Sequence, residues 1–397
     1  MLLLFTSMLV CITLTNAQLA APDKIMYSNL PDPLVTEAGL IVDDISTWEN
    51  TRRGEILKIF TEEVYGQSPQ PGDYTTIFSI VSTTSIANGT AVRKMVQISV
   101  TGPNRTHAFE VPVYLPIKAE KVPVFILINH RTPIYDTTST IGFCPLDSII
   151  LPRGYGVAVI NDVDVADDNW REDKYREGVI GAFDLDGPND WKTIAAWSFA
   201  ASRMLDYLET DPDVDASKIA VIGHSRGGKA SLWIGAQDER IALTCVNNSG
   251  CTGDALARRA QGETIKDINK NFPHWFADKY NDYIEQDQNL PFDQHQLASL
   301  IAPRLLATAS ASEDNWADPV GQFHSLVFAQ PVFALYGKTT TTWQTVDAPD
   351  RSGPSVILRN GNIQHHMRAG GHDLKEEDWN NYLDFADLKF SLGGKTK

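Results

Sequence analysis

One serine in the sequence has the surroundings typical of a catalytic nucleophile. Residues 223–227 read G-H-S-R-G, a G-x-S-x-G pentapeptide centred on Ser225, between an apolar run at 219–223 and a helix-like segment at 230–236. Glycines on both sides permit a sharp strand-to-helix turn that lifts the serine hydroxyl out of a sheet. The N-terminus of the following helix favours developing negative charge. We therefore predict that Ser225 attacks a carbonyl carbon.

A serine hydroxyl needs a base to remove its proton, and the base needs a third group to hold it. The acid is expected just past a late strand. Glu313, Asp314 and Asp318 all follow the apolar run at 304–309. A carboxylate in such a loop is often merely solvated, so spacing alone leaves all three open.

The base is expected in the polar, glycine-rich loop after the last predicted strand, 355–358. His365, His366 and His372 lie there, ahead of a helix predicted to begin at about Glu376. Each can reach back toward the serine, and position alone does not choose among them.

The elements that must position these residues alternate between short apolar strands and helices. A helix predicted at 190–209 lies between two of the strands, and strand–helix–strand repeats build a parallel sheet with helices on both faces. Runs at 91–100 and 109–115 predict an antiparallel edge, and 51–65 predicts a capping helix. The expected fold is an α/β-hydrolase three-layer sandwich with a mostly parallel central sheet and an antiparallel N-terminal edge. The strands predicted to be buried in it are 122–129, 157–161, 219–223, 241–247 and 304–309.

The composition and the N-terminal residues indicate where the protein acts and exclude some classes of partner. Residues 1–17 form an apolar run ending in small residues, which predicts a signal peptide and therefore a secreted or periplasmic protein; 18–397 then form a single catalytic domain. The net charge of −16 argues against a nucleic-acid partner, and no later run is apolar enough to span a membrane. No metal-binding motif occurs. We expect a monomer without metal or cofactor.

Six blocks together resemble one family, the glucuronoyl esterases of carbohydrate esterase family 15. The resemblance covers the chain from about residue 122 to the C-terminus. The blocks are GHSRGGK at 223–229, NSGC at 248–251, GET at 262–264, FPHWF at 272–276, EDNWADP at 313–319 and HMRAGGH at 366–372.

The resemblance implies hydrolysis of the ester that joins 4-O-methyl-glucuronic acid of glucuronoxylan to a lignin alcohol, through an acyl-enzyme. It also assigns roles to the residues left open above. The base matches His366 and the acid matches Asp314, because Asn248 stands where other members carry a glutamate. Arg226 is expected to stabilise the oxyanion through its backbone N–H and its guanidinium group. The residues expected to contact the sugar are Lys229, Glu263 and Trp316.

Two other functions remain open at this point. One is a carboxylesterase with the same chemistry on another polysaccharide ester, such as acetyl-xylan or a pectin methyl ester. The other is a catalytically inactive carbohydrate-binding protein on a hydrolase scaffold.

Overall fold

The computed structural model describes residues 27, 29–118, 120–136, 143–183 and 187–390. The chain divides into two units, 1–30 and 31–397, and the second contains every element discussed below. The predicted signal peptide at 1–17 lies outside the described residues. Within the described ranges, no helix is both long and apolar enough to cross a membrane.

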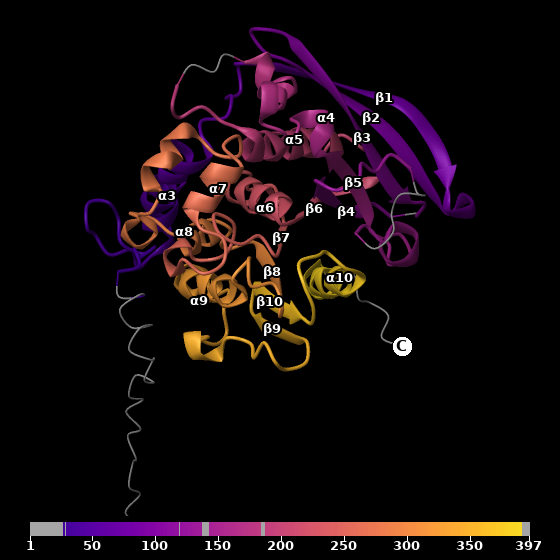
Figure 1. Ribbon diagram of the computed structural model, residues 1–397. Coiled ribbons are helices and arrows are strands. Elements are labelled where there is room, and N and C mark those ends of the chain that lie inside the picture. Colours follow the sequence, from indigo (N-terminus) through magenta and orange to yellow (C-terminus); the bar gives the residue numbers. More distant parts are fainter. Residues whose placement is uncertain (1–26, 28, 119, 137–142, 184–186, 391–397) are drawn as a thin grey trace, which may run out of the picture. The chain divides into compact units, whose positions relative to one another are not determined.

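Ten strands of the described chain form one sheet in the order β1-β2-β3-β5-β4-β6-β7-β8-β10-β9. The strands from β5 to β10 in this order run parallel, while β1, β2 and β3 form an antiparallel edge and β9 pairs antiparallel with β10. The expected N-terminal antiparallel edge is confirmed (Figure 1). The bounds of the strands are β1 Thr75–Ile86, β2 Ala91–Thr101, β3 Thr106–Pro116, β4 Val122–Asn129, β5 Gly156–Asn161, β6 Val214–His224, β7 Leu243–Asn247, β8 Leu305–Ala311, β9 Val356–Asn360 and β10 Ile363–Arg368.

Helices cover both faces of this sheet, as expected for three layers. On one face α5 packs on α6, and α6 and α9 both pack on α8, whereas α10 lies on the other face against β7, β8 and β10 (Figure 1). Each face has its own apolar core, because the central strands are buried on both sides. The bounds of the helices are α2 Ile45–Thr47, α3 Arg53–Phe60, α4 Asp162–Val165, α5 Thr193–Leu208, α6 Arg226–Gln237, α7 Ile265–Asn271, α8 Gln294–Ser299, α9 Pro319–Leu335 and α10 Glu376–Phe390.

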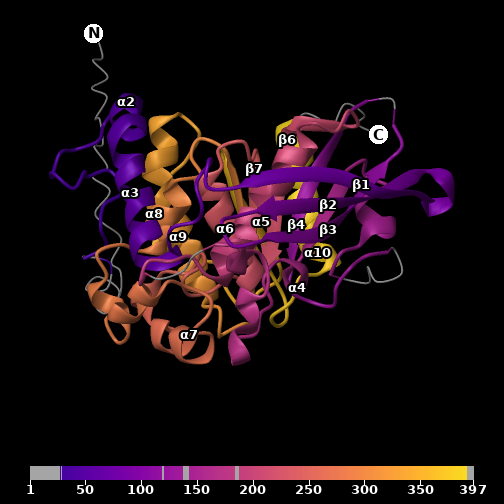
Figure 2. The same ribbon diagram turned by 90° about the horizontal axis from the view of Figure 1, so that it is seen from above.

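The predicted cap at 51–65 is helical throughout, with α3 continued by a π turn at Thr61–Tyr65. Its buried side chains, including Ile56 and Phe60, join the larger core. The segment packs against α8 (Figure 2). The segment therefore adds to the helical layer that contains α8.

All the parallel strands end at the same edge of the sheet, so the loops that follow them gather there. These loops carry His130 after β4, Asp168 after β5, Asn248 after β7, Asp314 after β8 and His372 after β10. Ser225 follows β6, at the centre of that edge.

Candidate active site

Ser225 stands at the turn between β6 and α6 in a backbone conformation that few side chains adopt, with φ 54° and ψ −124°. Its backbone N–H donates to the Asn247 carbonyl oxygen over 2.8 Å. A Cβ atom on Gly223 would lie 2.0 Å from the carbonyl oxygen of Gly227, and one on Gly227 would lie 2.6 Å from that of Ile128. Only glycine fits at either position, so the predicted strand–serine–helix turn is present.

Among the three candidate histidines, the one that pairs with a candidate acid at this edge is His372. Its Nδ1 lies 2.6 Å from Asp314 Oδ2, and the carboxylate is 4% exposed. A carboxylate only accepts hydrogen bonds, so the imidazole proton is on Nδ1 and Nε2 is left as an acceptor. Asn248 Nδ2 donates to the same oxygen over 3.0 Å. This arrangement can take a proton from a hydroxyl group.

His366, the histidine expected to be the base, has other surroundings. It lies within β10, fully buried, with Nε2 2.9 Å from Asp378 Oδ1 and its ring against Tyr382. Side chains inside a strand point to the faces of the sheet rather than along it. His366 therefore faces the α10 layer and does not pair with Asp314.

The remaining candidates from the sequence have partners elsewhere. His365, on the opposite face of β10, hydrogen-bonds to Thr308 and Ser310. Asp318 pairs with Arg259 over 2.6 Å, and Glu313 is exposed. Among the three acids, Asp314 is the one joined to a histidine of this loop.

A cavity of about 220 Å³ opens beside Ser225 and His372. Lys229, Glu263 and Trp316 all line it, as do Arg226, Asn248, Ser249, Gly250, Phe272, Trp275 and Ala317. Trp316 is half exposed, so one face of its ring is available for stacking. The three residues expected to contact a sugar are thus brought together next to the serine.

Lys229 is buried in the floor of this cavity. Its Nζ donates to Glu263 Oε2 over 2.8 Å, to the Ser249 carbonyl over 2.8 Å and to the Cys251 carbonyl. An ammonium group has three donors, so all are in use. Lys229 can donate to a sugar hydroxyl only by releasing one of these acceptors.

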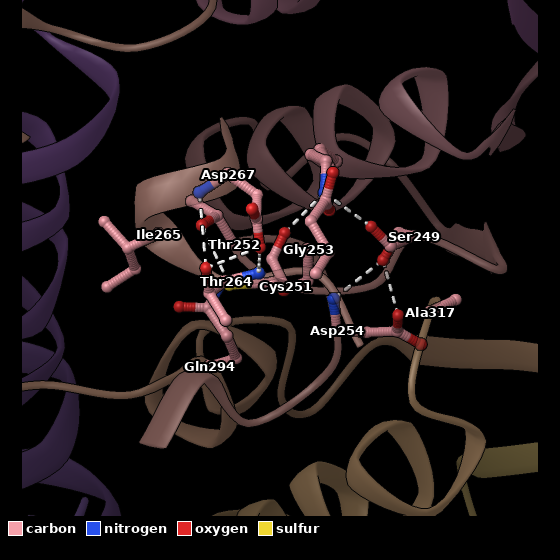
Figure 3. Close-up of polar contacts among 12 residues, drawn as sticks. Ser249, Cys251, Thr252, Gly253, Asp254, Thr264, Ile265, Asp267, Gln294 and Ala317 are labelled. Carbon is pink, nitrogen blue, oxygen red and sulfur yellow. Dashed lines mark hydrogen bonds and ion pairs between the residues drawn. The ribbon is translucent and has the colours of Figure 1, made fainter. Parts of the chain in front are cut away.

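The loop that supplies the two carbonyl groups is held by a second layer of polar contacts. The Ser249 hydroxyl donates to the buried Asp254, and the Thr264 side chain caps α7 together with Asp267 (Figure 3). Gln322 also donates to Asp254, over 2.7 Å. Burial raises the pKa of Asp254 to about 6. These contacts hold in place the backbone that supplies the acceptors of Lys229.

Arg226 follows the serine, lines the cavity and forms an ion pair with Asp168 behind it in the loop after β5. Its Nη1 pairs with Asp168 Oδ2, and its guanidinium carbon lies 4.8 Å from the ring centre of Trp275. Asp168 also accepts from His274 Nε2 over 2.8 Å and from Trp275 Nε1 over 2.7 Å. Burial alone would raise the pKa of this carboxyl, but the His274 hydrogen bond and the Arg226 charge hold it below its usual value.

His224, inside the pentapeptide, packs on the ring of His372 with the two centres 4.4 Å apart. Arginine can only donate, so Arg131 Nη2 donates to His224 Nε2 over 3.2 Å, and His224 Nδ1 donates to Asn247 Oδ1 over 2.7 Å. Burial, followed by the proximity of His372, lowers the pKa of His224 well below its usual value. A neutral imidazole thus covers one side of His372.

Sequence reasoning did not identify Asp168, His274 or His224 as parts of the site. Asp168 belongs to an acidic run after a buried strand, and that position at the carboxyl end of β5 was the available signal. His224 was visible inside the pentapeptide, but nothing in the sequence indicated which ring it would contact.

Comparisons with known proteins agree on one family. The model of the family described as "Glucuronyl esterase, fungi" matches residues 98–337. The carbohydrate esterase MZ0003, from an unknown prokaryotic organism, is 37% identical, over 92% of this chain and 90% of the relative. A 4-O-methyl-glucuronoyl methylesterase of Phanerochaete carnosa is 28% identical over 87% of this chain and 79% of its own. The solved structure of a glucuronoyl esterase from Solibacter usitatus is 34% identical with a TM-score of 0.80, covering 91% of this chain and 98% of that one.

Proposed function

The chain belongs to the glucuronoyl esterases of carbohydrate esterase family 15, and on that premise we propose that it hydrolyses the ester between 4-O-methyl-glucuronic acid of glucuronoxylan and a lignin alcohol. One observation carries the proposal. A serine, a histidine–aspartate pair and the three side chains expected to contact a sugar meet around one cavity. The activity named for the Phanerochaete carnosa relative supports the choice of ester.

In the first half of the reaction, Ser225 Oγ attacks the ester carbonyl carbon while His372 Nε2 takes the hydroxyl proton. Asp314 keeps the imidazole in the tautomer with its proton on Nδ1 and stabilises its positive charge. His372 then gives the proton to the departing alcohol, leaving a glucuronoyl-serine ester. A water molecule activated by His372 hydrolyses that ester and releases glucuronate.

His372 takes the role in this scheme that the family resemblance had given to His366. The reason is its hydrogen bond to Asp314 and its place in the wall of the cavity that Ser225 lines. Asn248 supports the pair by donating to the same carboxylate oxygen.

The tetrahedral intermediate carries a negative charge on the former carbonyl oxygen. We assign its stabilisation to the Arg226 backbone N–H, at the start of α6, and to the Arg226 guanidinium group. A preorganised donor of this kind contributes about 3 kcal/mol to the transition state. Trp316 stacks on the sugar ring and Glu263 accepts from its hydroxyls, while Lys229 holds Glu263 and joins the contact when a sugar hydroxyl replaces one of its acceptors.

We further propose that residues 1–17 direct export to a secreted or periplasmic location and that 18–397 act as one monomeric catalytic domain. N-terminal sequencing of the exported protein would test the first statement, since it should begin at residue 18. Size-exclusion chromatography with light scattering would test the second.

The deciding experiment compares benzyl glucuronate with an acetyl ester of xylan, measuring acid release by titration at constant pH. We expect glucuronate release to dominate in kcat/KM. Faster hydrolysis of the acetyl ester or of a pectin methyl ester would reassign the substrate, and activity on none of them would favour a carbohydrate-binding protein.

A further inference from the structure

The Asp168 carboxylate connects three side chains from two separate segments of the chain, and two of them, Arg226 and Trp275, line the cavity. Its Oδ2 pairs with Arg226, which follows the serine, and its Oδ1 accepts from His274 and from Trp275. Asp168 itself lies in the loop after β5. The carboxylate is 13% exposed, and its pairing therefore takes place largely out of water.

We propose that Asp168 is a positioning residue for transition-state stabilisation, holding the Arg226 guanidinium group in place for the oxyanion formed at Ser225. This inference rests on the esterase function proposed above. According to this inference, the rate also depends on a residue outside the set of serine, histidine and acid.

The first argument concerns the freedom of the arginine side chain. A free arginine side chain has about 2 kcal/mol of rotamer entropy, and a donor contributes most to a transition state when it is already in place. Arg226 lies over Phe272 and Trp275, whose rings are stacked 3.8 Å apart. Such stacking fixes the plane of the guanidinium group but permits it to slide. The pair with Asp168 removes that remaining freedom.

The second argument concerns the donors that remain available. Asp168 takes Nη1, and a guanidinium group has five N–H donors. The ion pair therefore leaves donors for an oxyanion. His274 and Trp275 donate hydrogen bonds to the other oxygen of Asp168, so the position of this carboxylate is fixed as well.

A double-mutant cycle distinguishes a role of Asp168 in positioning Arg226 from a role in stability alone. The variants are Asp168→Asn, Arg226→Gln and both together, assayed on benzyl glucuronate. A residue that acts through Arg226 should affect kcat far more than KM, and its effect should vanish once Arg226 is gone. We expect Asp168→Asn to lower kcat roughly 10- to 100-fold, and the double variant to match Arg226→Gln within about threefold.

A matched control is Asp278→Asn. Asp278 pairs with Lys192 over 2.6 Å, and Lys192 also donates to the carbonyl of Pro273, the residue before His274. Loss of this ion pair should leave kcat unchanged. If Asp168→Asn does not fold, as judged by thermal unfolding, Asp168→Glu replaces it. The loss of kcat caused by Asp168→Glu should likewise disappear when Arg226→Gln is also present.

Two results would overturn the inference: multiplicative losses in the double variant, or a near-normal kcat for a folded Asp168 variant. Failure of the proposed function is distinguishable, because wild-type protein would then release no glucuronate. The cycle would in that case be run on 4-nitrophenyl acetate, whose hydrolysis passes through the same kind of oxyanion. Inactivity on both esters would refute the esterase and the role of Asp168 together.

Discussion

Replacing His372 or His366 by alanine should produce opposite defects. His372 is about one-third exposed and pairs with Asp314 at the cavity. His366 is fully buried and joins β10 to α10 through Asp378. We expect His372→Ala to be inactive and stable, and His366→Ala to be active and less stable.

The loss of activity in His372→Ala follows from its role as the base that activates Ser225. Removal of one member of a catalytic triad typically lowers kcat by about 10⁴ or more. Because the side chain is partly exposed, water can take its place beside Asp314, which also keeps the hydrogen bond from Asn248. We therefore expect the free energy of unfolding to change by only about 1 kcal/mol.

The loss of stability in His366→Ala follows from its contacts. The variant loses a 2.9 Å hydrogen bond to a carboxylate and gains a cavity beside Tyr382. Asp378 stays paired with Arg368 over 2.8 Å, so the cost is below that of stranding a buried charge. We estimate about 2–4 kcal/mol. At about 2 cal/mol/K per residue, this lowers Tm by roughly 3–5 °C.

The measurements are glucuronate release from the benzyl ester and thermal unfolding of each variant. Activity of His366→Ala is taken well below its own Tm, so that loss of folded protein does not appear as loss of kcat. A His372→Ala variant that retains more than about a tenth of the wild-type kcat would refute the assignment. So would a folded, inactive His366→Ala.

Two further predictions concern the catalytic residues, and a third concerns the buried His365. Ser225→Ala should fold and lose kcat by several powers of ten; unchanged activity would exclude it as nucleophile. Asp314→Asn should lower kcat steeply with KM little changed. Adding Asn248→Glu should restore part of the rate, because Asn248 lies 3.0 Å from the carboxylate oxygen that holds the imidazole, so a longer carboxylate there is expected to reach the same imidazole; absence of any rescue would contradict that expectation. Burial and the neighbouring His366 lower the pKa of His365 from 6.5 to about 3. As the pH is lowered, His365 is therefore protonated in the unfolded chain before it is protonated in the folded protein, and stability falls as pH drops from 6.5 toward 3. His365→Asn should flatten that slope by up to about 1.4 kcal/mol per pH unit, measurable by urea unfolding at pH 6.5 and 4.5; an unchanged slope would contradict it.

The sequence predicted most of the central sheet because those strands are continuously apolar. The run at 122–129 matches β4 residue for residue, and the strands of the antiparallel edge at 91–100 and 109–115 lie within β2 and β3. β1 was not predicted, since Thr75–Ile86 is largely exposed and rich in threonine and serine. Its position as the outermost strand explains that composition.

The network around Asp168 could not be predicted, because its partners are far apart in sequence. Arg226 lies 58 positions away and Trp275 lies 107 positions away. Four aspartates follow β5 within seven residues, at 162, 164, 167 and 168. Their spacing does not indicate which one pairs with Arg226. That depends on the path of an irregular loop, which no periodicity encodes.

The histidine chosen from the sequence and the one proposed from the structure differ because the sequence did not reveal strand β10. The segment Ile363–Arg368 contains two histidines, a glutamine and an arginine, which is typical of a loop, yet it is a fully buried strand. Its polar side chains are tolerated there because they are paired, His365 with Thr308 and His366 with Asp378. A side chain within a parallel strand points to a face of the sheet, and only residues past its carboxyl end reach the edge where Ser225 lies. Once the strand is known to end at 368, the three histidines separate, and the one past that end, His372, is the residue that we propose as the base.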